Sequence, residues 1–265
     1  MTLQIATFNI WNRSGDWDAR LAVLRRELSQ IRPDILGLQE VVQVEYDGTK
    51  FDQGEIIGEG LGYHVFYGRH PDNPYPWGNS ILSRHPFTRT KTLNLPDGGT
   101  DERRALVLAS IATPRGEIAV GCTHLNWKLD EGHIREEQIV FVVEELLAFA
   151  DGTTLPPVLI GDLNADPDSD EIRYLRGLTT LKGGRTYFSD AFHLAGPPGD
   201  SGATYARSNP YAAPLREPDR RIDYIFSRGP DTEGRGEPLR ARRIFTEPQN
   251  EVFASDHYGV LAELS

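Results

Sequence analysis

The pattern that most limits the possible folds is an apolar run, an amphipathic helix and a second apolar run near the N-terminus. Residues 3–10 form a short β-like run that is mostly apolar. Residues 16–32 repeat apolar side chains at helical spacing, with Asp16 as the expected N-cap and Pro33 ending the pattern. Residues 35–39 are again β-like. A strand, a helix and a strand at this spacing predict a parallel strand pair joined by a crossover helix.

The rest of the chain continues this alternation. Strand-like runs follow at 63–67, 80–83, 105–111, 118–123, 157–161, 222–226 and 258–264, and a second amphipathic helix is expected at 133–150. Because strands outnumber helices and the helices lie between them, we predict an α/β sandwich in which two β-sheets pack face to face with helices outside. Without an evident linker or repeat, residues 1–265 are expected to form a single domain. Residues 68–79 and 195–221 are expected to be loops that select the substrate, and residues 228–243 a charged surface loop.

Charge and composition limit the classes of molecule that the chain is expected to bind. The formal net charge of −11 argues against tight non-specific binding to a nucleic-acid duplex, where phosphate contacts dominate affinity. Cys122 is the only cysteine, so no internal disulfide is expected, which suits a reducing compartment. No signal peptide and no apolar run of membrane-spanning length are recognised, and no segment indicates an obligate protein partner. These features together predict a cytoplasmic location.

Polar residues stand where the apolar runs end. Asn9 follows the first run, Glu40 the second, His124 the run at 118–123, and Asp162 and Asn164 the run at 157–161. Strand ends in sheet folds are the usual place for catalytic groups. Asp162 and Asn164 are two residues apart, so on an extended backbone they face the same side. Several strand ends carrying Asn, Glu, His and Asp predict convergence on one site.

The C-terminal third adds two more polar strand openings. Asp256 and His257 precede the last strand, and Asp223 begins another. A carboxylate beside a histidine fixes its tautomer and raises its basicity. The full set is rich in carboxylate and amide oxygens, which suits a hard cation such as Mg²⁺ or Mn²⁺, whereas zinc favours more histidine or cysteine.

These stretches, taken together, resemble the endonuclease/exonuclease/phosphatase superfamily, the DNase I-like fold. They occur in the family's order along the whole chain: Thr7-Phe8-Asn9-Ile10, Leu38-Gln39-Glu40, Gly78-Asn79-Ser80-Ile81-Leu82-Ser83-Arg84, Thr123-His124-Leu125, Gly161-Asp162-Leu163-Asn164, Arg221-Ile222-Asp223-Tyr224-Ile225 and Ser255-Asp256-His257. Each motif alone is weak, but seven in order are specific. The resemblance implies a four-layer α/β sandwich of two mixed sheets and Mg²⁺- or Mn²⁺-dependent hydrolysis of a phosphoester.

The resemblance also implies roles for individual residues. Glu40 is expected to be the main metal ligand, with Asn9 and Asp256 close by. Asp162 is expected to orient or deprotonate the attacking water, and Asn164 to hold that water or the phosphate. Both one-metal and two-metal schemes fit this set.

The histidines complete the expected machinery. His257, paired with Asp223, is expected to contact the phosphate. His124 matches a histidine of the DNase I, sphingomyelinase and inositol phosphatase branches, where apurinic endonucleases have Tyr. Apurinic endonucleases also commonly carry an acidic residue at the position of Trp11, so that branch is disfavoured.

Residues around this set bear on the substrate. Asn79 matches a family position near the phosphate, with a role in a turn as the alternative. Trp127, which follows His124, is expected to line the mouth of the site. Arg103 and Arg104 precede a strand and could meet an anionic substrate, although a solvated loop is the preferred interpretation.

Three substrate classes remain open. They are a small or lipid-head-group phosphodiester, a DNA or RNA strand, and an inositol phosphate cleaved as a monoester. The acidic charge favours the first over the second. A binding module that has lost catalysis is disfavoured, because all of the expected carboxylates and histidines are present.

Overall fold

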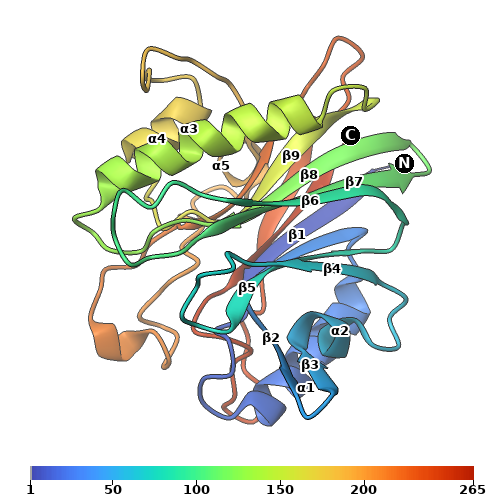
Figure 1. The fold of residues 1–265 in the computed structure, drawn as a ribbon, viewed down its shortest axis with the longest axis vertical. Coiled ribbons are helices and arrows are strands. Elements are labelled where there is room, and N and C mark those ends of the chain that lie inside the picture. The colour runs from blue at the N-terminus through green and yellow to red at the C-terminus, as the bar shows by residue number, and fades with distance from the viewer. Residues whose placement is uncertain (1) are drawn as a thin grey trace.

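The computed structural model describes residues 2–265 and consists of two β-sheets packed face to face with helices on both outer sides (Figure 1). The predicted four-layer α/β sandwich is therefore confirmed. One sheet has seven strands, with β3 (Thr49–Asp52) paired to β2 and the others in the order β12 (Pro238–Ile244), β13 (Gly259–Leu264), β1 (Leu3–Asn9), β2 (Ile35–Tyr46), β5 (Trp77–Ser83) and β4 (His64–Gly68). The other has six, in the order β10 (Ser189–Asp190), β11 (Asp223–Ser227), β9 (Leu155–Asp162), β8 (Gly116–His124), β7 (Ala105–Thr113) and β6 (Phe87–Asn94).

The helices divide between the two outer faces. On the side of the seven-stranded sheet lie α1 (Trp17–Ile31) and α2 (Gln53–Gly58), and on the side of the six-stranded sheet lie α3 (Gly132–Phe149) and α4 (Asp170–Leu175) (Figure 1). A short helix, α5 (Ala191–Ala195), follows β10, and a single 3-10 turn covers Ala213–Leu215. In the described part of the chain, no helix has both the length and the apolar character needed to cross a membrane.

The first helix begins and ends where the sequence predicts. The side chain of Asp16 caps α1 by accepting a hydrogen bond from the backbone N–H of Ala19 at 3.1 Å. The helix ends at Ile31, and Arg32 adopts a left-handed conformation ahead of Pro33. The buried face of α1 includes Leu24 and packs on the outer face of β1 and β2.

The core between the sheets is apolar and closely packed. It includes Ile5 and Ile35 from one sheet and Val120 and Ile160 from the other. Gly37 on β2 lies so close to the opposite sheet that a Cβ atom there would stand 2.5 Å from Cδ1 of Ile160. The two sheets therefore meet at van der Waals contact with no room for a larger residue at this point.

Two parallel strand pairs set the position of the site. β1 runs parallel to β2 with α1 as the crossover, and β8 runs parallel to β9 with α3 as the crossover. The carboxyl ends of β1 and β2 lie at one edge of their sheet, and those of β8 and β9 at one edge of theirs. β11 and β13 run antiparallel to β9 and β1, so their first residues reach the same edges.

The expected charged loop at 228–243 is only partly a loop. Its second half forms the edge strand β12, which pairs with β13. Arg240 and Arg242 on this strand point outward and are exposed. Charged side chains are common on edge strands because they discourage pairing with other chains. High charge was interpreted as a sign of a loop, but the charged residues from 238 to 243 belong to a strand at the edge of the sheet.

Candidate active site

The polar strand ends of both sheets meet at one cleft. β1 ends at Asn9, β8 at His124 and β9 at Asp162, while Asp223 begins β11 directly opposite Asp162. A cleft of about 370 Å³ opens at this edge, a size typical of a small-ligand site. Its lining includes eight of the residues proposed from the sequence: Asn9, Glu40, His124, Trp127, Asp162, Asn164, Asp256 and His257.

Asp162 lies at the centre of these side chains. Its Oδ2 atom accepts a hydrogen bond from Nδ2 of Asn9 at 3.0 Å and lies 3.4 Å from Nε2 of His124 and 3.9 Å from Nε2 of His257. Its Oδ1 atom accepts the backbone N–H of Asn164 at 3.0 Å. Burial and the charge of Asp223 raise the pKa of Asp162 to about 7, although its hydrogen bonds and the charge of His257 oppose the rise. A carboxyl group with such a pKa can take up a proton near neutral pH.

His257 is held from behind by Asp223. Its Nδ1 atom lies 3.0 Å from Oδ2 of Asp223, and both side chains are buried. Burial lowers the pKa of His257, but the charge and hydrogen bond of Asp223, with the charges of Asp256 and Asp162, outweigh burial and raise it well above its ordinary value. The ring of Tyr205 lies 5.1 Å from the imidazole. This environment favours an imidazolium whose Nε2 faces the cleft.

His124 has the opposite electrostatic environment. It is buried, and its ring stacks on Trp77 with the ring centres 5.9 Å apart. Burial and the positive charges of Arg104 and His257 lower its pKa well below the ordinary value. The two histidines of the cleft therefore differ, one favouring the charged form and the other the neutral form.

Glu40 is presented to the cleft by an irregularity in β2. The pairing of β2 with β5 shifts register around it, and its backbone has a positive φ of 58°, which is costly for a residue with a side chain. Its Oε1 atom accepts Nδ2 of Asn9 at 3.2 Å, and its Oε2 atom accepts Nδ2 of Asn12 at 2.8 Å. Each carboxylate oxygen keeps a further lone pair for another ligand.

The side chains of Glu40 and Asp256 both line the cleft and could supply oxygen ligands to a divalent cation. Burial raises the pKa of Asp256 to about 6 despite the charge of His257, and the negative charge of Glu40 adds to the rise. Two carboxylates that repel each other in a cleft form an oxygen donor set suited to a hard cation. Nδ2 of Asn9 donates to Glu40 at 3.2 Å and to Asp162 at 3.0 Å, while Oδ1 of Asn9 accepts the backbone N–H of Trp11 at 3.0 Å.

A second group of potential metal ligands consists of Asp162, Asp223 and His257. One ligand atom from each lies within 4.8 Å of the others, and all three residues are buried. Asp223 and His257 already engage each other through the 3.0 Å contact. We therefore interpret these three residues as a hydrogen-bonded acid–base group beside the cation ligands.

A buried arginine holds two of the loops that carry the site. Arg20 of α1 is fully buried and donates hydrogen bonds to the carbonyl oxygens of Ile10 at 2.8 Å, Ser14 at 2.8 Å and Asn12 at 3.1 Å. It also donates to the carbonyl of Ala254 at 2.9 Å, just before Asp256. The segment after β1 and the segment before β13 are thus tied to one side chain, which fixes Asn12 and Asp256 relative to each other.

Aromatic side chains form one rim of the cleft. Tyr75 stacks on Trp77 with ring centres 5.8 Å apart, and Trp127 is 54% exposed while its Nε1 donates to Oε1 of Glu102 at 2.9 Å. Asn79 lies outside the main cleft, in a small adjoining cavity, and its Nδ2 donates to the carbonyl of Ala105 at 2.9 Å. Trp127 thus stands at the mouth of the cleft, whereas Asn79 lies behind its wall.

Arg104 was expected in a solvated loop, and that expectation is wrong. Its side chain is only 4% exposed and lines the cleft, with Nη2 3.0 Å from Oε2 of Glu102 and Cζ 5.1 Å from the Trp77 ring centre. β7 runs antiparallel to β8, with Leu106 opposite Thr123. The residue before β7 therefore reaches the edge where His124 ends β8. That pairing is the signal that could have placed Arg104, and the sequence alone does not give it.

Other residues at or beside the cleft were also missed. Tyr205 lines the cleft, and Asn12 contacts Glu40 from the segment after β1; both lie in segments whose course depends on tertiary contacts. Arg220, which also lines the cleft, donates to Oδ2 of Asp166 at 2.9 Å and to the carbonyl of Asn164 at 3.2 Å. It thereby holds the loop that follows β9.

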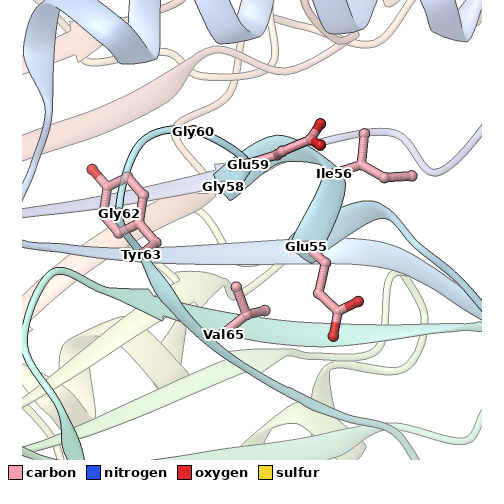
Figure 2. Close-up of a pocket in the computed structure, with 8 residues that line it drawn as sticks. All are labelled: Glu55, Ile56, Gly58, Glu59, Gly60, Gly62, Tyr63 and Val65. Atoms are coloured by element: carbon pink, nitrogen blue, oxygen red, sulfur yellow. The ribbon is translucent and has the colours of Figure 1, made fainter.

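A larger hollow of about 440 Å³ lies beside α2 and carries none of this chemistry (Figure 2). Its charged lining residues are Glu55 and Glu59, whose side chains point in different directions. Glu55 pairs with Lys50 and Glu59 with Arg25. The smaller cleft, where histidines and carboxylates meet, is therefore the candidate active site.

Comparison with known proteins identifies the family of the chain. The model of the Endonuclease/Exonuclease/phosphatase family matches residues 6–257. Protein angel homolog 2 of Mus musculus is 27% identical over 178 residues, which are 60% of this chain and 31% of that protein. The matched region thus spans about a third of that relative's length.

Solved structures share the fold over nearly the whole chain. An endonuclease/exonuclease/phosphatase from Beutenbergia cavernae is 26% identical with a TM-score of 0.71, over 99% of this chain and 71% of that one. Truncated TDP2 from Caenorhabditis elegans is 20% identical with a TM-score of 0.76, over 100% of this chain and 98% of that one.

Proposed function

The chain belongs to the endonuclease/exonuclease/phosphatase family, and we propose that it is a divalent-metal-dependent phosphodiesterase that uses water as the nucleophile. The observation that carries this proposal is the convergence of Glu40, Asp162, His124 and His257 on one cleft, with Asp223 behind His257. Phosphoester hydrolysis depends mainly on positioning and on offsetting charge, and these residues supply both.

Glu40 and Asp256 would hold the cation, and Asn9 would orient Glu40 through its amide. When bound, Mg²⁺ or Mn²⁺ would offset negative charge on the phosphoryl group. Asn12 supports the second oxygen of Glu40, so that this carboxylate is fixed from both sides. A fixed carboxylate loses little freedom on binding a cation.

Asp162 is proposed to hold and deprotonate the attacking water. Its pKa near 7 lets it accept a proton at neutral pH, and its Oδ2 atom faces the centre of the site. Asn164 is fixed beside it, with a backbone φ of 49° and Nδ2 donating to the carbonyl of Leu125 at 3.1 Å. This pair would place the water on one side of the phosphorus, in line with the leaving oxygen.

The two histidines are proposed to act on the phosphoryl oxygens and the leaving group. His257, charged and oriented by Asp223, would stabilise negative charge that builds on the phosphoryl oxygens. His124, neutral, would donate a hydrogen bond to the leaving oxygen without bringing a second full charge into the cleft. The different environments of the two rings support different roles.

The preferred substrate is proposed to be a compact phosphodiester, such as a lipid head group or a nucleotide-like molecule. Both arginines that line the cleft are paired with carboxylates, Arg104 with Glu102 and Arg220 with Asp166. A cleft with paired cations, in a chain of net charge −11, offers little attraction to a long polyanion. The aromatic rim, by contrast, suits an apolar or planar leaving group.

A substrate panel tests the proposal. Hydrolysis of bis-p-nitrophenyl phosphate, sphingomyelin, an inositol phosphate, RNA and plasmid DNA would be compared with Mg²⁺ and with Mn²⁺ at physiological salt. We expect the small diesters to be cleaved fastest. Efficient plasmid nicking that falls steeply with added salt would instead assign a nuclease, and faster release of phosphate from the inositol phosphate would assign a monoesterase. Inactivity toward every substrate would refute the proposed enzyme.

A further inference from the structure

Three nitrogen atoms in the wall of the cleft lack hydrogen-bond partners among residues 2–265. They are Nε and Nη1 of Arg104 and Nδ1 of His124. The two side chains are 4% and 6% exposed, so bulk solvent does not reach these atoms. Leaving a buried polar atom unpaired is unfavourable, and more so when it belongs to a charged group. Both side chains line the same small cavity, so one bound molecule could serve all three atoms.

The cavity beside these two side chains is the candidate place for that molecule. It has a volume of about 10 Å³ and is lined by Arg104 and His124 together with Trp77 and Asn79. This is room for about one water molecule, and a buried water needs two to four polar partners. Arg104 provides donors and the imidazole of His124 provides a ring nitrogen, so the chemical surroundings suit a molecule that both accepts and donates hydrogen bonds.

We propose that this cavity is a binding site for a single water molecule, through which Arg104 fixes the tautomer of His124. The water would accept hydrogen bonds from the guanidinium of Arg104 and donate one to Nδ1 of His124. The ring proton of His124 would then reside on Nε2, which lies 3.4 Å from Oδ2 of Asp162. His124 would thus present an N–H group to the centre of the cleft.

The placement of Arg104 supports this role. Its Nη2 is held 3.0 Å from Oε2 of Glu102, and its Cζ lies 5.1 Å from the ring centre of Trp77, which in turn stacks on His124. The guanidinium is therefore fixed in position relative to the imidazole. Burial and nearby positive charges lower the pKa of His124, so the ring is neutral and its tautomer decides which nitrogen donates. Arg104 is thus a positioning residue that acts through the water.

An anion in the same cavity would give a different result. Chloride or a similar ion accepts hydrogen bonds but donates none, so it would pair with Arg104 and require the proton of His124 to be on Nδ1. The tautomer of His124 therefore distinguishes the two occupants. The consequence for catalysis rests on the proposed phosphodiesterase activity, but the tautomer itself is measured without substrate, so the two proposals can fail separately.

The test is a long-range ¹H–¹⁵N spectrum of histidine-labelled protein, with the His124 signals assigned from a His124→Gln variant. We expect a single tautomer protonated on Nε2 in the wild type. In Arg104→Met this preference should be lost, and kcat should fall by about 10-fold with little change in KM. In Arg104→Lys, which keeps a donor, the wild-type tautomer should return.

Arg103→Met is the matched control. Arg103 also borders the cavity, but its Nη1 atom lies 2.9 Å from Oδ2 of Asp97, outside the proposed contact. Its loss should leave the His124 signals unchanged. A wild-type ring protonated on Nδ1, or an Arg104→Met variant that keeps the Nε2 tautomer, would overturn the proposal. If Arg104→Met does not fold, the wild-type and Arg104→Lys spectra decide the question.

Discussion

Removing the side-chain amide of Asn12 should weaken metal binding without unfolding the protein. Asn12 was not singled out from the sequence, yet its Nδ2 lies 2.8 Å from Oε2 of Glu40. Its own carbonyl is held by Arg20 at 3.1 Å and by Nε2 of Gln53 at 2.8 Å. The backbone contacts remain in Asn12→Ala, so the change should remove the support of one carboxylate oxygen of Glu40 and the hydrogen bond that Oδ1 accepts from Oγ of Ser14 at 2.9 Å. Because the backbone φ of Asn12 is 41°, where Asn is better tolerated than Ala, a small loss of stability is expected as well.

The expected loss of metal affinity is set by the hydrogen bond between Asn12 and Glu40. A hydrogen bond to a charged group contributes about 1.5–3 kcal/mol, and part of this is recovered when water replaces the amide. The second amide contact to Glu40, from Asn9 at 3.2 Å, remains in the variant. We therefore expect Mn²⁺ affinity to fall by about 10-fold, which corresponds to about 1.4 kcal/mol.

The assay is calorimetric titration of Mn²⁺ into the wild type and into Asn12→Ala, with thermal unfolding followed in parallel. Thr90→Ala is the control, because Thr90 is exposed on the edge strand β6 and pairs with Ala109 in the middle of β7, away from the end of β7 that reaches the cleft. The control should bind Mn²⁺ as the wild type does. Equal Mn²⁺ affinity in the wild type and Asn12→Ala would refute the assignment of Glu40 as a supported metal ligand.

Three further substitutions test other parts of the account. Asp223→Asn should lower kcat by about 100-fold with little change in KM, because Nδ1 of His257 loses the carboxylate 3.0 Å away. An unchanged kcat would exclude the Asp223–His257 pair from catalysis. Trp127→Ala should raise KM for a small diester by about 10-fold and affect kcat less, since an aromatic contact is worth about 0.5–1.5 kcal/mol; a loss confined to kcat would contradict this. Gly37→Ala should lower the free energy of unfolding, measured by urea titration, by about 1–3 kcal/mol, because the new Cβ would meet Cδ1 of Ile160 at 2.5 Å. Adding Ile160→Val, which removes that Cδ1 atom, should restore part of the lost stability. Additive effects of those two changes would show that the sheets do not meet there.

Much of the fold could be predicted because its signals are local. The cap at Asp16 and the helical spacing after it are written in consecutive residues, and so is the apolar run that ends at Asp162. Catalytic groups are expected at strand ends, and the carboxyl ends of parallel strands lie at one edge of a sheet. This expectation placed residues that are distant in the sequence at one site. The contact between His257 and Asp223, expected from their motifs, is present at 3.0 Å.

The features that were missed depend on pairing between distant strands. Arg104 enters the cleft only because β7 runs antiparallel to β8, and nothing in the neighbouring residues gives that direction. Strands β6 and β12 lie at sheet edges, where polar side chains face solvent and hide the alternation that marks a strand. Asn12 reaches Glu40 from a segment with positive φ values at Trp11 and Asn12. Such a course is set by the tertiary contacts of Arg20 rather than by local preference.

The rate of p-nitrophenol release from bis-p-nitrophenyl phosphate tests directly whether this cleft hydrolyses a phosphodiester with a divalent cation. After dialysis against EDTA we expect no release, and full activity on adding Mn²⁺ or Mg²⁺. Glu40→Gln should require at least about 10-fold more metal, and Asp162→Asn should stay inactive at saturating metal while remaining folded. Undiminished hydrolysis in EDTA, or a wild-type rate in Asp162→Asn, would contradict the account.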